Sequence, residues 1–175
     1  RIYRNSKQTK ENGQIILNSI NLDSLYDLSK LTGEAICNSF NSNKIKVVRI
    51  SNVIGNSNIS NNFFDNLLNQ ARKKKNIILN DHINSEKDYI IIDDVVSIVL
   101  KILLHGKYRC YNVASGCNIS NKKILELIKL NFNINYKFNH NAKIIKNKII
   151  NIDLIKNEFN FVPTSPLSKI KLILK

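Results

Sequence analysis

The sequence has few cysteines and no long apolar run, and these two absences exclude several classes of protein. Its three cysteines, Cys37, Cys110 and Cys117, are odd in number and form no C-x-x-C pair, so neither a disulfide framework nor a zinc site is indicated. No run of about 18 apolar residues occurs, so we expect no transmembrane helix, and no secretory signal sequence is visible at the start. We therefore expect a cytoplasmic protein that does not enter a membrane.

Acidic residues and arginine are also scarce. The chain carries 27 lysines and arginines against 13 acidic residues, a net charge of +14, which raises the question of a nucleic-acid partner. Only five of the basic residues are arginines, although nucleic-acid sites favour the bidentate arginine fork. The lysine excess accompanies an excess of asparagine and isoleucine, as a strongly AT-biased genome would produce, and the densest basic cluster, 72–75, ends an expected helix, where cations suit the helix dipole. We therefore expect no nucleic-acid partner.

Short β-branched segments alternate with segments of helical periodicity along the 175 residues, 43% of which are apolar. This alternation predicts an α/β fold. Helices are expected at 23–41, 62–75, 95–106 and 120–130, from Asp153 onward and after Pro166. Strands are expected at 44–50, 76–79, 88–92, 108–114, 135–138 and 148–151, and a Gly/Asn/Ser loop at 55–62. Asp93 and Asp94 are expected to cap the third helix, which Gly106 ends, and Ser120 to cap the fourth.

The first expected helix contains the stretch SLYDLSKLTGEAI (24–36), which has two different faces. An apolar set recurs at helical spacing and is expected to be buried: Leu25, Leu28, Leu31, Ala35 and Ile36. Tyr26 and Lys30 lie one turn apart on another face. A phenol has an ordinary pKa of about 10 and is a poor base at neutral pH, but a nearby ammonium favours the phenolate and makes the pair a plausible acid/base. The pattern Y-x-x-x-K also arises by chance, and an exposed tyrosine beside a solvated lysine is the alternative.

This stretch resembles the Y-x-x-S-K-x-x-G-E helix of the extended short-chain dehydrogenase/reductases, in the NAD-dependent epimerase/dehydratase family. Five further segments resemble that family in the right order: RIYRNSKQTKENG (1–13), VVRISNVIG (47–55), KDYIIIDDVVSIV (87–99), YNVASGCNISNKKILELI (111–128) and NIDLIKNEFNFVP (151–163). In the second of these, Ile54 replaces the usual tyrosine. Because the segments cover nearly all of the chain, the sequence is identified as a member of this family.

The resemblance implies the C-terminal part of a Rossmann-like NAD(P)-binding domain and a small α/β substrate-binding domain. Residues 1–55 and, in part, 88–115 are expected in the first domain, and residues 56–87 and 116–175 in the second. The family begins with a strand and G-x-x-G-x-x-G, whose glycines let the backbone approach the cofactor pyrophosphate. The five glycines of this sequence are isolated, and the family's catalytic serine or threonine would fall just before Arg1. We therefore expect the chain to be an N-terminally truncated fragment.

The resemblance also implies roles for single residues. Tyr26 would be the general acid/base that removes a proton from a sugar hydroxyl, and Lys30 would bind the cofactor ribose and favour the phenolate. Together with Asn52 and Val53, this pair is expected to contact NAD or NADP. Asn52 matches the family asparagine that contacts the phosphates or sugar of the substrate, and a local turn hydrogen bond is its alternative role.

Two lysines stand where the family has arginines that grip the nucleotide diphosphate. Lys87 and Lys143 keep the positive charge but lack the bidentate fork, and for Lys143 a plain solvated side chain is the alternative. The implied function is that of an NAD(P)-dependent epimerase, dehydratase or 4-keto reductase for a nucleotide-activated sugar, which is a homodimer in its full-length form. The alternative is a non-catalytic remnant or binding module of the same family, and in both cases we expect the chain to be inactive alone.

Overall fold

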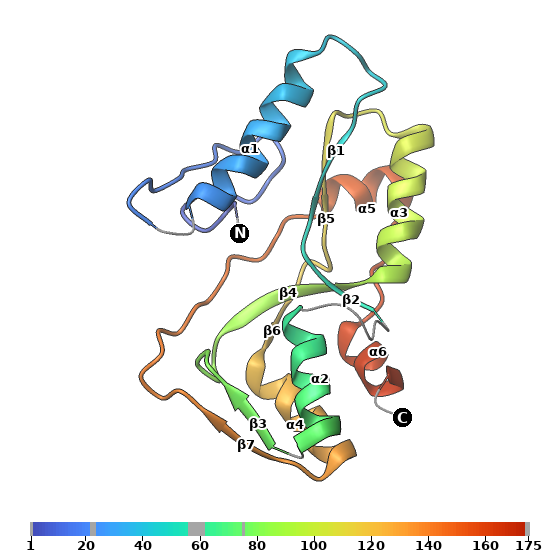
Figure 1. The fold of residues 1–175 in the computed structure, drawn as a ribbon. Coiled ribbons are helices and arrows are strands. Elements are labelled where there is room, and N and C mark those ends of the chain that lie inside the picture. The colour runs from blue at the N-terminus through green and yellow to red at the C-terminus, as the bar shows by residue number, and fades with distance from the viewer. Residues whose placement is uncertain (1, 22–23, 56–61, 75, 174–175) are drawn as a thin grey trace.

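The computed structural model describes residues 2–21, 24–55, 62–74 and 76–173 (Figure 1). Arg1, Asp23 in the first expected helix, 56–61 in the expected loop and Lys75 in the basic cluster lie outside the described residues. The described helices are α1 (Ser24–Ser39), α2 (Phe63–Lys74), α3 (Ile92–His105), α4 (Asn121–Phe132), α5 (Asp153–Phe159) and α6 (Pro166–Ile173). The described strands are β1 (Val47–Ile50), β2 (Asn52–Ile54), β3 (Asn76–Leu79), β4 (Glu86–Ile91), β5 (Cys110–Val113), β6 (Asn118–Ser120) and β7 (Asn135–Phe138). The expected α/β fold is confirmed.

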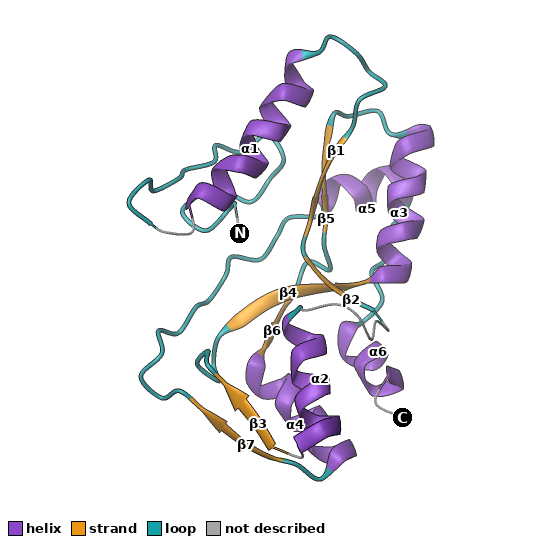
Figure 2. Cartoon of the chain, in the orientation of Figure 1, coloured by secondary structure: helices purple, strands orange, loops and turns teal. Residues whose placement is uncertain are grey.

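The described strands form three small sheets (Figure 2). β1 pairs in parallel with β5, β2 in parallel with β4, and β3 in parallel with β7, while β6 is antiparallel to β4. β1 leads into β2 through Ser51, whose N–H donates to the carbonyl oxygen of Val113 at 3.0 Å. The carboxyl ends of β1 and β5 therefore meet the start of β2, which is the end of a parallel sheet where α/β proteins bind ligands.

The core consists of two clusters of buried side chains. One joins β5 to α3 and α5 and includes Ile98, Ile102, Tyr111, Val113 and Ile155. The other joins α2, α4 and β3 and includes Phe64, Leu68, Ile77, Ile124 and Leu125. Burying a side chain of this size stabilises the fold by about 1.5–3 kcal/mol, so the two clusters hold the strands that reach the carboxyl end of β1.

Helix α1 departs from the expectation that its apolar face is buried. Leu25, Leu28 and Ile36 are 78%, 53% and 55% exposed, so that expectation is wrong for the described chain. No residue of α1 belongs to either buried cluster, and the helix lies to one side of β1 and β5 (Figure 1). Apolar periodicity identifies a helix, but it does not show whether another segment covers the apolar face.

Two arginines attach α1 to the strands. Arg49, in β1, forms an ion pair with Glu34 of the helix. Arg109, just before β5, donates through Nη2 to the carbonyl oxygens of Cys37 and Phe40 at 2.8 and 2.6 Å. Polar contacts therefore hold the middle and the C-terminal end of this helix.

The strand expected at 148–151 is not formed. The segment is bound by the side chain of Thr9, whose Oγ1 donates to the carbonyl oxygen of Ile149 at 2.8 Å and accepts from the N–H of Asn151 at 3.0 Å. Backbone groups that have no partner strand must find other partners. A β-branched run therefore predicted extended backbone here, but not a sheet.

The expected capping role of Asp93 and Asp94 is also wrong. Helix α3 begins at Ile92, and no side chain caps its first turn. Asp93 instead forms an ion pair with Lys169 at 2.8 Å, and Asp94 accepts from the N–H of Thr164 at 2.7 Å. Both carboxylates lie in the first turn, where negative charge suits the dipole. Asp93 connects α3 to α6, and Asp94 connects it to the segment before α6.

Two other helix ends are confirmed. Ser120 caps α4, because its Oγ accepts from the N–H of Lys123 at 3.3 Å. Gly106 follows α3 and donates its N–H to the carbonyl oxygen of Ile102 at 2.9 Å. The strands β2 and β6 were not expected, since each has three residues and is too short for a periodic pattern.

Among the described helices, none combines the length and the apolar character needed to cross a membrane. The same residues contain no group of three or more His, Cys, Asp or Glu side chains that could hold a metal ion. Cys37, Cys110 and Cys117 are free thiols.

Candidate active site

A cleft with a volume of about 700 Å³ opens beside α1. Its walls come from α1, from 46–52 around β1, from the start of β4, from 2–4 and from 145–150. Segments far apart in the sequence therefore meet at the carboxyl end of β1. Because parallel α/β folds bind ligands at that end, this cleft is the candidate active site.

Tyr26 and Lys30 both line the cleft, from successive turns of α1. The Nζ atom of Lys30 lies over the Tyr26 ring, 5.1 Å from its centroid, where a cation and a ring face attract each other. Tyr26 is 53% exposed, and Lys30 is exposed as well. The four-residue spacing thus places a phenol and an ammonium side by side, on the side of the helix that faces the cleft.

Asn52 and Lys87 line the same cleft, from β2 and β4. Asn52 Nδ2 donates to the backbone oxygen of Asp88 at 2.8 Å, which holds the amide against β4. Lys87 Nζ donates to Asp81 Oδ2 at 3.1 Å and lies 4.7 Å from the centroid of the Phe63 ring. The structure therefore brings an amide and a cation into the cleft that contains the tyrosine–lysine pair.

The other two site residues expected from the sequence, Val53 and Lys143, do not line the described cleft. Val53 is half-buried and packs against the cluster that joins β5 to α3 and α5. Lys143 is exposed. Lys148, five positions later, lines the cleft and donates to the carbonyl oxygens of Ser6 and Lys7. The resemblance singled out Lys143, whereas Lys148 is the lysine of this segment that lines the described cleft.

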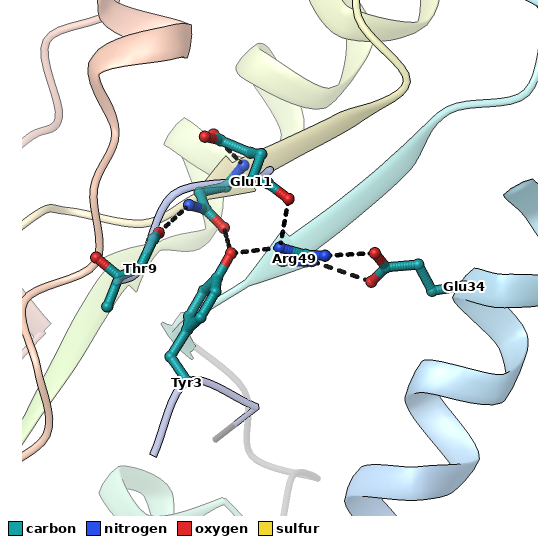
Figure 3. A network of polar contacts seen from close by, with 6 residues as sticks. Tyr3, Thr9, Glu11, Glu34 and Arg49 are labelled. Carbon is teal, nitrogen blue, oxygen red and sulfur yellow. Dashed lines mark hydrogen bonds and ion pairs between the residues drawn. The ribbon is translucent and has the colours of Figure 1, made fainter. Parts of the chain in front are cut away.

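A polar network joins α1 to the strands and the N-terminal segment (Figure 3). Arg49, the third residue of β1, donates through Nε to Glu34 Oε2 at 3.0 Å and through Nη2 to Glu34 Oε1. Its Nη1 donates to Tyr3 Oη at 2.6 Å and to the carbonyl oxygen of Glu11 at 3.1 Å. Tyr3 donates in turn to Asn112 Oδ1 at 2.7 Å. The Arg49 guanidinium therefore joins β1 to α1 and to the N-terminal segment, and Tyr3 extends the network to β5.

Burial and bonding act in opposite directions on this network. Burial lowers the pKa of Arg49, but the hydrogen bonds with Glu34 and Tyr3 outweigh it, so that the pKa of Arg49 lies above its ordinary value. Burial also raises the pKa of the Tyr3 phenol, and the bond from Arg49 opposes that rise. At neutral pH the guanidinium is therefore charged and the Tyr3 phenol neutral, which suits a hydrogen-bonding link rather than an acid/base.

Asp88 is a buried carboxylate in the cleft wall, with 3% of its surface exposed. Its Oδ1 accepts from the N–H of Ser115 at 3.0 Å, and its Oδ2 from the N–H of Cys117 at 3.1 Å. Burial raises the pKa of Asp88, and the loop's N–H donors oppose the rise. The carboxylate thus holds the loop 115–117 against β4.

Sequence reasoning missed Arg49, Glu34 and Asp88 as parts of the site. The signal for Arg49 was its place inside the β-branched run KIKVVRI, since a charge within such a strand is seldom buried without a partner. The partner, Glu34, could not be identified from spacing, because the two residues meet only in the folded chain.

A family model for the NAD dependent epimerase/dehydratase family matches residues 2–114. This range contains α1, β1, β2, β4 and β5, and therefore most of the cleft. The chain belongs to this family. The resemblance of the sequence segments is thereby confirmed. No curated protein sequence matches the chain.

Solved structures of nucleotide-sugar dehydratases and epimerases share the fold of this chain. TunA, an NAD-dependent NDP-hexosamine 5,6-dehydratase involved in tunicamycin biosynthesis, matches with a TM-score of 0.84 and 15% identity. A UDP-glucuronic acid 4-epimerase from Bacillus cereus, in complex with UDP-glucuronic acid and NAD, matches with a TM-score of 0.80 and 19% identity. A dTDP-glucose 4,6-dehydratase from Bacillus anthracis, in complex with NAD, matches with a TM-score of 0.77 and 19% identity.

The alignment with TunA covers 99% of this chain and 58% of the solved chain. The alignment with the 4-epimerase covers 98% and 56%, and that with the 4,6-dehydratase 99% and 57%. The chain thus spans somewhat more than half the length of these structures. At such identities the likeness shows the fold, including the later part of a Rossmann-like domain, and no activity follows from it alone.

Proposed function

We propose that these residues belong to an NAD(P)-dependent epimerase, dehydratase or 4-keto reductase that acts on a nucleotide-activated sugar. The observation that carries the proposal is the exposed Tyr26–Lys30 pair, which faces the cleft in a chain of this family. Asn52 and Lys87 add an amide and a cation to the same cleft.

The described residues fit one end of a dinucleotide, NAD or NADP. The Lys30 ammonium forms no ion pair within the described residues, so it can bind ribose hydroxyls beside Tyr26. The pyrophosphate of the dinucleotide is bound by backbone N–H groups of a glycine-rich loop. The five glycines of this sequence are isolated and form no such loop. When bound, the nicotinamide accepts and returns a hydride.

Tyr26 is proposed to transfer the proton that accompanies the hydride. A sugar hydroxyl is a poor hydride donor unless its proton leaves at the same time. The phenolate oxygen of Tyr26 takes that proton, and the phenol gives it back in the reverse direction. The Lys30 ammonium, 5.1 Å from the ring centroid, favours the phenolate.

Lys87 and Asn52 are proposed to bind the diphosphate and the sugar of the substrate. Asp81 keeps the Lys87 ammonium at the cleft, with Nζ and Oδ2 3.1 Å apart. Structures similar to this chain include an epimerase in complex with UDP-glucuronic acid and MoeE5 in complex with UDP-glucose, which supports a nucleotide sugar as the substrate class. The roles of Lys143 at the diphosphate and Val53 at the cofactor stay predictions, because neither lines the described cleft.

We propose the domain division expected from the sequence with one change. The residues of α5 join the buried cluster of β5 and α3, so we assign α5 to the dinucleotide-binding domain rather than to the substrate-binding domain. The expected homodimer is part of the proposal, and the exposed apolar side of α1 supports it as a surface that a second copy would cover.

The alternative is a non-catalytic remnant or binding module of the same family, which binds a nucleotide sugar without turning it over. The natural protein that contains these residues should be incubated with NAD or NADP and a panel of UDP-, dTDP- and GDP-sugars, and the sugars followed by proton NMR. Conversion of one sugar to an epimeric, dehydrated or reduced product supports the enzyme. Calorimetric binding of a sugar with no conversion across the panel supports the alternative.

A further inference from the structure

Helix α1 places two carboxylates within one turn of Lys30: the buried Asp27, three positions before it, and Glu34 after it. Lys30 and Glu34 are four positions apart, so their Cβ atoms are about 5–6 Å apart on one side of the helix. In the described structure they do not pair, because Arg49 binds both carboxylate oxygens of Glu34. The Lys30 ammonium lies over the Tyr26 ring instead.

We propose that Arg49 is a positioning residue that neutralises Glu34 and thereby leaves Lys30 to act on Tyr26. This inference rests on the proposed function, in which Tyr26 and Lys30 are the acid/base pair. The side chains of Arg49 and Glu34 are only 10% and 14% exposed, and ion pairs that are partly buried are screened less by salt than exposed ones.

Removal of Arg49 would have two consequences for Tyr26. The Glu34 carboxylate would regain an uncompensated negative charge on the side of α1 that carries the phenol. It would also attract the Lys30 ammonium toward itself and away from the Tyr26 ring. Both changes disfavour the phenolate, so each moves the titration of Tyr26 to higher pH.

The other charged groups at the cleft do not bind Glu34. Lys87 is paired with Asp81, and Asp88 accepts two backbone N–H groups. The remaining charged side chains that face the cleft from α1 and from the other walls are Arg4, Asp27, Lys46 and Lys148. The neutral titratable groups there are Tyr3 and Cys37. Within the described residues, Arg49 is the one cation that binds the Glu34 carboxylate.

Arg109 is a matched control, because it also attaches α1 to the strands. Its Nη2 donates to the carbonyl oxygens of Cys37 and Phe40, and it does not line the cleft. A change at Arg109 therefore weakens the attachment of the helix without exposing the charge of Glu34.

The test is the titration of Tyr26 in the absence of cofactor, followed by NMR of chains with carbon-13 in the tyrosine rings. The chain has six tyrosines, and the signal of Tyr26 is the one lost in Tyr26→Phe. Arg49→Gln should raise the titration midpoint of Tyr26. Arg49→Gln combined with Glu34→Gln should remove most of this rise, and Arg109→Gln should leave the midpoint as in the wild type.

Equal midpoints for the single and the double variant would overturn the proposal, since Arg49 would then act as a tether and not through charge. No rise in a folded Arg49→Gln variant would overturn it as well. If circular dichroism shows that Arg49→Gln does not fold, the Glu34→Gln variant is measured instead. An unchanged or lower midpoint of Tyr26 in that variant supports the neutralisation of Glu34 by Arg49. A higher midpoint contradicts it. Because the titration needs no turnover, these outcomes stand apart from a failure of the proposed enzymatic function.

Discussion

At the residue scale, the cleft contains cations in two different states. Arg49 and Lys87 are each paired with a carboxylate, Glu34 and Asp81, so their positions are set by the protein. The Lys30 ammonium has no carboxylate partner among the described residues and rests on the Tyr26 ring. A carboxylate partner fixes the position of a cation, whereas a cation without one, beside a phenol, can stabilise the phenolate.

Replacement of Lys87 by alanine should weaken the use of the substrate. A hydrogen bond to a charged group contributes about 1.5–3 kcal/mol, so kcat/KM for the nucleotide sugar should fall by roughly 10- to 100-fold, mainly through KM. Lys101→Ala is the matched control, because that lysine of α3 is exposed and outside the described cleft, and it should change kcat/KM less than about twofold. A loss for Lys101→Ala as large as that for Lys87→Ala would contradict the assignment of Lys87 to the diphosphate site.

Asp88 predicts a dependence of stability on pH. Burial raises the pKa of Asp88 above its ordinary value of 3.8, so the folded protein binds this proton more tightly than the unfolded chain. The contribution of Asp88 to stability is therefore greatest below pH 3.8, and it is lost as the pH rises through the higher pKa of the folded state. The Asp88→Asn variant lacks this contribution.

Urea unfolding of the wild type and of Asp88→Asn between pH 7 and pH 4 measures the contribution of Asp88 to stability. The difference in free energy of unfolding should move in favour of the wild type as the pH falls. At neutral pH the variant should be less stable by about 1–3 kcal/mol, because one loop N–H loses its acceptor. A difference that stays constant with pH, or moves in favour of the variant, would show that Asp88 is not held in a raised-pKa environment.

At the element scale, the sequence predicted which segments are helices and strands better than it predicted what they pack against. The alternation of β-branched and helical segments was enough for α1, β1, α3 and β5, because each contains a full period of its pattern. The apolar face of α1 was expected to be buried and is exposed, since periodicity contains no information about the neighbouring layer. The segment 148–151 has the residues of a strand but lacks a strand partner in the described chain.

The site was predictable to a similar degree. Tyr26, Lys30, Asn52 and Lys87, which the resemblance to family segments singled out, all line the described cleft, and their roles stay predictions. The contact between Arg49 and Glu34 was not found, because it depends on how α1 lies against β1.

Two glycines should respond in opposite ways to alanine. Gly116 has a φ of +73°, and a Cβ there would lie 2.9 Å from Ile152 Cδ1, so Gly116→Ala should destabilise the fold by about 1–3 kcal/mol. Gly33 lies within α1 with no atom within 4 Å of such a Cβ, so Gly33→Ala should stabilise the helix by about 0.5–1 kcal/mol. Thermal unfolding of both variants checks the pair, and a Gly116→Ala variant as stable as Gly33→Ala would contradict the described loop 115–117.

At the scale of the whole molecule, two buried clusters support a cleft to which at least five separate segments contribute. The fold matches 56–58% of the length of solved sugar-nucleotide enzymes. Within that shared part lie the tyrosine–lysine helix and the strands that carry Asn52 and Lys87. The net charge of +14 is compatible with an anionic substrate such as a nucleotide diphosphate.

The most direct test of the proposed function is the initial rate against pH in the natural protein that contains these residues, with a nucleotide sugar and NAD or NADP. Tyr26→Phe removes the acid/base but keeps the ring under Lys30, so kcat should fall by roughly 10²- to 10⁴-fold with KM little changed. Tyr108→Phe is the matched control, because Tyr108 is equally exposed, at 52%, but lies outside the described cleft, and its kcat should stay within about twofold of the wild type. Turnover of Tyr26→Phe at a rate close to that of Tyr108→Phe would contradict the assignment of Tyr26 as the acid/base.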